Sequence, residues 1–271
     1  MEVEQAMISV LQHLFSAAVD IRQGKLEGTI PSDELAEIEC LFRHIADQMP
    51  LSCHVQCCYG MLLVLMGRHS EALPIYSRAV NASLRINRTS ADSGRRMVVL
   101  LHNNNDLDHI APVIYKWSIS SQGPVFVVWS PDFPDHKNCE LLLSYLNSLP
   151  RVQMYTPDPS MILMISWTRE LRKIGILGQE HLGLSLVSAL LAHFIPSSED
   201  GVLVTDPFVL PLTRELCESA RFRGIKCVAL PHGETVVYSR KVLKNDTSIT
   251  FEAIDHVENK ASSAESVDRG Q

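Results

Sequence analysis

The stretch from Asp200 to Glu234 constrains the fold more than any other part of the sequence, because its pattern is strand, helix, strand. Val202–Thr205 and Ile225–Leu230 are short apolar runs rich in β-branched residues, which favour buried strands. Between them, Pro211–Arg223 has the apolar spacing of an amphipathic helix. A connection of this length joins parallel strands by a right-handed crossover. The stretch therefore predicts one unit of a parallel α/β sheet.

The same alternation extends back to Arg96. Further strands are expected at Arg96–Leu101, Pro124–Trp129 and Arg151–Tyr155, and further helices at Asp106–Ser120, Asn138–Leu149, Met161–Ile174 and Leu182–Ile195. Five strands alternating with helices predict a doubly wound, Rossmann-like parallel sheet over residues 96–245. We expect the strand order 3-2-1-4-5, which puts the point where the order reverses between the first and fourth strands.

Polar residues follow the strands that border this reversal. Ligands of such sheets bind outside the carboxyl ends of the strands, in the crevice at the reversal point. The candidate ligand-binding residues are those just after the first, fourth and fifth strands, namely His102, Asn103, Asn104, Asp106, Thr205, Asp206, His232, Gly233 and Glu234. The loop from Trp129 to Asp135 either rims this crevice or is a plain turn.

His232 and Asp206 are the candidate catalytic residues. A histidine on a strand-end loop can contact a ligand phosphate or act as a base near neutral pH, and Gly233 beside it lets the backbone approach a ligand closely. Asp206 can hold an acceptor hydroxyl or pair with His232. The alternatives are a histidine that only shapes its loop, an aspartate that caps the following helix, and asparagines at 103–105 that are ordinary turn residues.

The first 86 residues predict an all-helical domain. Helices are expected over Val3–Arg22, with Val3, Met7, Val10, Leu11, Leu14 and Ala18 on one face, and from Ser32 to Pro50, with Leu35, Ile38, Leu41, Phe42 and Ile45 on one face. The following segment resembles one tetratricopeptide repeat, whose small and aromatic signature positions fall on Gly60, Ala72, Tyr76 and Ala79. One repeat cannot bury its own face, so the two preceding helices are expected to stack on it. A generic helical hairpin is the alternative.

Four residues at the start of this repeat-like segment, Cys53, His54, Cys57 and Cys58, raise the question of a metal site. Helical spacing puts Cys53 and Cys57 on one face, but no second pair of ligands has a suitable spacing. Because cysteine is often buried between packed helices, core packing is the favoured interpretation, and no metal or other cofactor is expected.

Composition excludes several classes of function. The net charge of −7 leaves no basic stripe to bind nucleic acid. No Gly-rich dinucleotide or phosphate-loop motif and no nucleophile elbow is present. Seven scattered cysteines, a start without a signal peptide and no apolar run long enough to span a bilayer favour the cytoplasm. A C-terminal tail at 246–271 loses the periodic pattern, and its end is expected to be disordered.

Taken together, the strand-end segments resemble the N-terminal lobe of two-lobed glycosyltransferases. Met97–Val113 is similar to their opening strand, loop and helix, with His109 in the loop and Pro112 early in the helix. Asp200–Leu210 is similar to their cleft-lining strand, and Gly224–Gly233 resembles a segment of surface-polysaccharide and polyol-phosphate transferases. The resemblance implies a sugar or polyol-phosphate acceptor bound by this lobe.

In that family a second lobe binds the nucleotide-activated donor. The chain ends 39 residues after His232, which leaves no room for such a lobe, so we expect no transfer by the chain alone. A donor-lobe protein, or a protein bound by the helical segment, is the expected macromolecular partner. The alternative is a non-enzymatic interaction module that carries a degenerate Rossmann domain.

Overall fold

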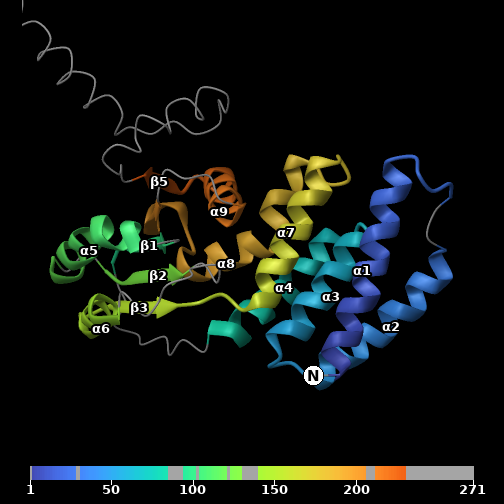
Figure 1. Cartoon of the computed structure of the whole chain (residues 1–271), viewed down its shortest axis with the longest axis horizontal. Coiled ribbons are helices and arrows are strands. Elements are labelled where there is room, and N and C mark those ends of the chain that lie inside the picture. Colours follow the sequence, from blue (N-terminus) through green and yellow to red (C-terminus); the bar gives the residue numbers. More distant parts are fainter. Residues whose placement is uncertain are drawn as a thin grey trace, which may run out of the picture.

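A computed structural model shows a helical half and an α/β half that lie side by side along the long axis of the molecule (Figure 1). It describes residues 2–28, 31–84, 94–101, 104–120, 123–129, 140–205 and 211–229. The backbone alone is described for a few residues at the start of two helices. All structural statements below concern these residues.

Four helices make up the N-terminal half, namely α1 (Glu2–Arg22), α2 (Ser32–Gln48), α3 (Cys53–Leu65) and α4 (His69–Leu84). Helices α1 and α2 both pack on α3, as expected for helices that cover a lone repeat. The tight turn between α3 and α4 contains Gly67, whose φ of 75° favours glycine.

The α3–α4 hairpin has the close packing that its small residues predict. Ala72, Tyr76 and Ala79 are buried, and a Cβ built on Gly60 would lie 2.4 Å from Cε1 of the Tyr76 ring. Glycine at position 60 thus makes the space that the tyrosine ring fills. The membership of this hairpin in the tetratricopeptide family stays a prediction.

In the C-terminal half, five described strands form one parallel sheet. They are β1 (Arg96–Leu101), β2 (Val125–Trp129), β3 (Val152–Tyr155), β4 (Gly201–Thr205) and β5 (Lys226–Ala229). Their order is β3-β2-β1-β4-β5, so the order predicted from the sequence is confirmed. The α/β fold class is confirmed with it.

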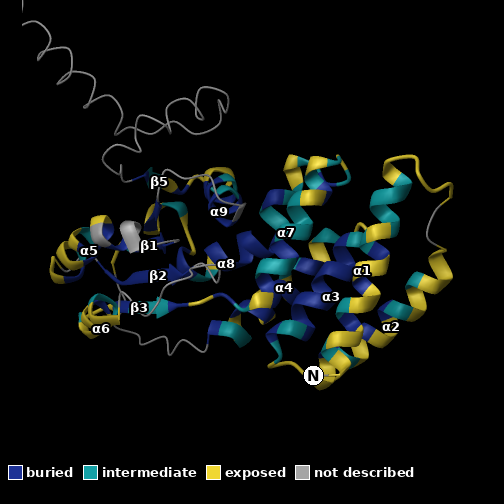
Figure 2. Cartoon of the chain, in the orientation of Figure 1, coloured by how far each residue is buried: buried dark blue, intermediate teal, exposed yellow. Residues whose placement is uncertain are grey.

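Alternate residues of each strand enter two different cores. Met97, Val99 and Leu101 of β1 join a core with α5 (Asn104–Ile119) and α6 (Glu140–Ser148). Val98 and Leu100 point into a larger core on the opposite face. The two sets separate because the side chains of a strand alternate between its faces. The second core continues without a break into the four N-terminal helices (Figure 2).

The larger core is bridged by α7 (Pro159–Lys173), α8 (Leu186–Phe194) and α9 (Pro211–Phe222). Helix α7 packs on α3, and α8 packs on α4. The Ser83 hydroxyl at the end of α4 also lies 3.1 Å from the Tyr155 hydroxyl at the end of β3. The predicted division into separable domains at residues 86 and 96 stays a prediction.

Several predicted helix starts differ from the observed ones by two to four residues. The helix expected from Leu182 begins at Leu186, after a 3-10 helix over Gln179–Leu184, because the Ser185 hydroxyl accepts a hydrogen bond from the Ser188 amide and caps α8. Helix α5 begins at Asn104, so His109 lies within the helix and not in the preceding loop. Asn and Asp residues at 104–106 favour an early start, since they suit a helix N-terminus.

Three residues expected on buried helix faces are instead exposed. Val3, Val10 and Leu41 are 47%, 36% and 58% exposed. The buried face of α1 and of α2 is narrower than the apolar stripe of the helix, because each of these helices packs mainly on α3.

Candidate ligand-binding site at the carboxyl edge of the sheet

The crevice predicted from the sequence starts where β1 and β4 end. These two strands are parallel neighbours, and the chain proceeds from β1 to β2 on one side and from β4 to β5 on the other. The reversal point therefore lies between β1 and β4. Ligands of doubly wound sheets bind at this point.

Only part of the predicted site falls within the described residues. Thr205 is the last residue of β4 and is buried. Asn104 and Asp106 belong to the first turn of α5, with only their backbone described. The other predicted site residues lie outside the described ranges, namely His102, Asn103, Asp206, His232, Gly233 and Glu234. Their convergence on one crevice stays a prediction.

A cavity of about 810 Å³ lies at the carboxyl ends of β2 and β3, on the β1–β2–β3 side of the reversal point. Trp129 at the end of β2 and Met154 of β3 form part of its wall together with Thr156 just after β3. One face of α6 supplies the rest of the wall through Glu140, Leu143, Ser144 and Asn147. These four residues share a face because they follow one another at helical spacing.

The cavity combines apolar and hydrogen-bonding groups. Trp129 is almost fully buried and Leu143 partly buried, while Ser144, Asn147 and Thr156 are exposed. Serine, threonine and asparagine side chains both donate and accept hydrogen bonds. Among the described residues that line it, Glu140 is ionisable and none is a lysine or arginine. Its hydroxyl and amide groups can pair with the hydroxyls of an uncharged ligand.

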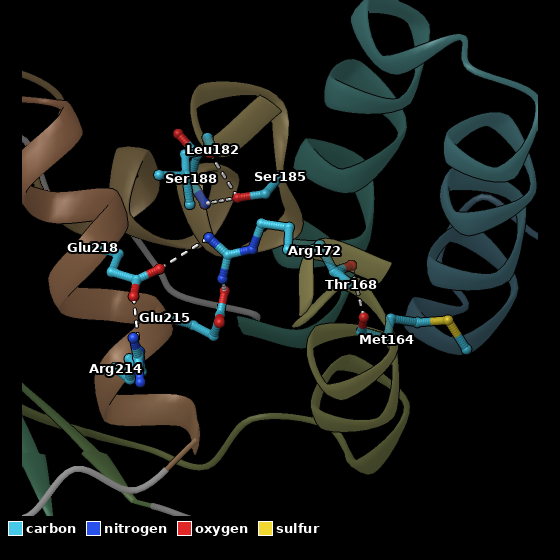
Figure 3. Close-up of polar contacts among 9 residues, drawn as sticks. All are labelled: Met164, Thr168, Arg172, Leu182, Ser185, Ser188, Arg214, Glu215 and Glu218. Carbon is cyan, nitrogen blue, oxygen red and sulfur yellow. Dashed lines mark hydrogen bonds and ion pairs between the residues drawn. The ribbon is translucent and has the colours of Figure 1, made fainter. Parts of the chain in front are cut away.

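A second polar cluster joins α7 to α9 (Figure 3). The Arg172 guanidinium donates to Glu215 and, at 3.0 Å, to Glu218, whose other oxygen lies 2.8 Å from Nε of Arg214. Burial raises the pKa of the Glu215 carboxyl, and the positive charge of Arg172 acts in the opposite direction. Perturbed carboxyls often mark functional sites. Here, however, Glu215 has an arginine partner on the facing helix, so the cluster acts as an ionic joint between two helices.

The cysteines at the start of α3 belong to the core. Cys53, Cys57 and Cys58 are buried, and Sγ of Cys53 lies 3.9 Å from Sγ of Cys57. Burial raises the pKa of Cys57 well above its ordinary value and that of Cys58 to about 12. The predicted core packing is confirmed, and the described residues hold no group of three or more potential metal ligands.

No protein-family model matches the chain, and no curated protein and no solved structure is detectably similar to it. The functional interpretation therefore rests on geometry and chemistry. None of the described helices combines the length and the apolar character that crossing a membrane requires.

Proposed function

We propose that the α/β half binds a hydroxyl-rich, sugar-like acceptor at the carboxyl edge of its sheet, as an acceptor lobe related to glycosyltransferases of surface-polysaccharide or polyol-phosphate synthesis. The lobe binds the acceptor and does not transfer sugar by itself. The observation that carries the proposal is the cavity of about 810 Å³ beside Trp129. Its position at the carboxyl edge is the one that ligands of parallel sheets occupy.

The lining of this cavity supports the choice of ligand. Asn147, Ser144 and Thr156 offer the paired donors and acceptors that sugar hydroxyls require. Leu143 and Met154, which are partly exposed, offer apolar surface on which the carbon face of a sugar ring can pack. A phosphorylated end of the acceptor would need contacts elsewhere, and the predicted residues His232 and Gly233 are the candidates for them.

Calorimetric titration of the full chain tests the proposal. The panel contains neutral oligosaccharides and polyol phosphates, each titrated into the wild type and into Asn147→Ala. Loss of one hydrogen-bonding side chain costs about 0.5–1.5 kcal/mol, so binding by the variant is expected to weaken by roughly three- to tenfold. Ser148→Ala is the matched control, because Ser148 lies next along α6, is not among the described lining residues and donates its hydroxyl to the Tyr145 carbonyl.

Two outcomes contradict the proposal. Equal binding by the wild type and Asn147→Ala would remove the cavity as the site. Absence of binding to every member of the panel would favour the alternative function, a non-enzymatic interaction module in which the α/β half is degenerate. Transfer of an activated sugar by the purified chain would contradict the proposal that the lobe does not catalyse transfer by itself.

A further inference from the structure

Helices α1 and α2 leave an open groove between them. Both pack on α3, and Figure 1 shows that α1 and α2 lie at an angle and spread apart from each other toward the end of α1. The groove has a volume of about 710 Å³. Leu14 is part of its buried floor, and its walls and end include Val10, Ala17, Ile21, Leu26 and Ile38.

Apolar side chains are exposed in this groove. Val10 is 36% exposed and Leu26 is 51% exposed. Along α1 the lining residues Val10, Ala17 and Ile21 lie on one face of the helix, at spacings of seven and four. An apolar groove between two helices is the kind of surface into which a third amphipathic helix packs.

The surroundings of the groove are strongly acidic. Residues 2–48 contain nine aspartates and glutamates and three lysines and arginines, so most of the net charge of −7 of the chain lies in α1 and α2. The three cations are engaged within the fold, because Arg22 donates to the Ile174 and Gly175 carbonyls, Arg43 pairs with Glu39, and Lys25 lies 4.0 Å from Asp20. Glu27 and Glu34 line the groove itself together with His13, and none of the described lining residues is a lysine or arginine.

We propose that this groove binds an amphipathic helix of a partner protein, with apolar residues on one face and basic residues along its edges. The apolar face of the partner would lie on Leu14, Ala17 and Ile38, and its lysines or arginines would meet Glu27 and Glu34. The wall between Ser9 and Ile21 of α1 is about 18 Å long at 1.5 Å per residue, which corresponds to about three turns of a partner helix.

Charge argues against two other occupants. A second copy of the chain would bring its own acidic α1 and α2 against the same groove, and like charges across an interface oppose association. The segment 230–271 of the same chain carries seven acidic and five basic residues, so it has no excess of positive charge to offer. The proposal concerns the helical half and does not depend on sugar binding by the α/β half.

Fluorescence anisotropy with designed peptides tests the proposal. The first probe is a labelled peptide of about 14 residues with leucines at helical spacing and lysines elsewhere. The second has the same composition in an order without helical periodicity, and the third has glutamate in place of each lysine. The full chain is expected to bind the first peptide at least about tenfold more tightly than the other two, and added salt is expected to weaken this binding.

Matched variants locate the binding on the groove. Glu27→Lys together with Glu34→Lys is expected to weaken binding of the first peptide by about tenfold or more, because two attractions become repulsions. Glu37→Lys is the control for charge, since Glu37 is exposed on α2 and does not line the groove. For the apolar contact, Leu26→Ser is expected to weaken binding, whereas Leu51→Ser, at a position 84% exposed and outside the groove, is not.

Several results would overturn the inference. Equal binding of the three peptides, or equal loss in the lining variants and their controls, would exclude a specific groove. Light scattering that shows a dimer of the wild type, dissociated by the Glu27→Lys and Glu34→Lys pair, would identify a second copy as the occupant. Circular dichroism and thermal melting of each variant ensure that the comparison is made between folded proteins.

Discussion

The helical half contains two consecutive helix pairs that differ in how closely they pack. In α3–α4, Gly60 faces the ring of Tyr76, and the two helices share a fully buried interface. In α1–α2, the helices share α3 as a common support and enclose an open groove of about 710 Å³. The open pair is also the more charged one, because α1 and α2 contain ten charged residues and α3 and α4 contain two.

The difference lies in where the contacts are placed. Helix α2 is held to α3 near its middle and its end, where the Tyr59 hydroxyl donates to Glu39 at 3.1 Å and Gln56 donates to the Ala46 carbonyl at 2.8 Å. Among the described residues, no side-chain hydrogen bond joins the first two turns of α2 to α3, and these turns border the groove. A closed pair needs matched small and large residues along its full length.

The largest loss of stability is expected in a third helix pair, α7–α9, whose helices are joined by the ion pairs of Arg172. In Arg172→Met, the carboxyl of Glu215 stays buried without its partner, since both side chains are at most 10% exposed. Removing one member of a buried ion pair costs about 3–5 kcal/mol, measured as the free energy of unfolding in urea. Lys173→Met is the control on the same helix, because its pair with Glu170 is half exposed and is worth at most about 1 kcal/mol.

The loss in Arg172→Met is expected to depend on pH. Burial raises the pKa of Glu215 in the folded protein above the ordinary value of 4.5, so the folded state holds this proton more tightly than the unfolded state. The free energy of unfolding therefore falls as the pH rises from about 4.5 through the folded pKa. Arg172 opposes this rise of the Glu215 pKa, so its removal raises the folded pKa further. The destabilisation by Arg172→Met is therefore expected to be greatest at neutral pH and smaller near pH 4.5. A loss independent of pH would show that Glu215 is not its source.

An intermediate effect is expected for closing the space at Gly60. In Gly60→Val, the added side chain meets the ring of Tyr76, which is 1% exposed and has no room to move away. Overfilling a packed core costs about 1–3 kcal/mol of unfolding free energy. The combination with Tyr76→Leu is expected to recover part of this loss, because the ring that causes the clash is gone. Strictly additive losses in the double variant would contradict close packing at this point.

Much of the fold was predictable because the sequence repeats one simple pattern. The run Arg96–Leu101 matches β1 residue for residue, and the predicted sheet order is the observed one. Gly60 and Tyr76 were predictable because a small residue facing a large one is a local signal on a helical hairpin. The end of α8 was predictable from the sequence as well. Its start was not, because Ser185 caps the helix inside an apolar run, and the composition of the run does not reveal the cap.

The ionic joint and both cavities could not be predicted in the same way. Arg172 and Glu215 are 43 positions apart, and spacing along a helix does not say which distant helix it faces. The cavity on α6 had a partial signal, since Trp129 was considered as a possible rim of the crevice, whereas Ser144 and Asn147 follow no motif. The groove was hidden because Val10 fits the apolar stripe of α1 as well as the buried Leu11 and Leu14 do.

The smallest change in the free energy of unfolding is expected for a substitution in the open pair α1–α2. Its size tests whether the groove is open in solution. Val10 and Val80 are the same residue type in two helices of the same half, but Val10 is 36% exposed and Val80 is 1% exposed. Val80→Ala removes buried methyl groups and is expected to lower the free energy of unfolding by about 2 kcal/mol. Val10→Ala removes the same groups from the wall of an open groove, where the expected change is within about 0.5 kcal/mol. Equal losses in the two variants would mean that α1 and α2 close on one another, and the proposed docking surface would then not exist.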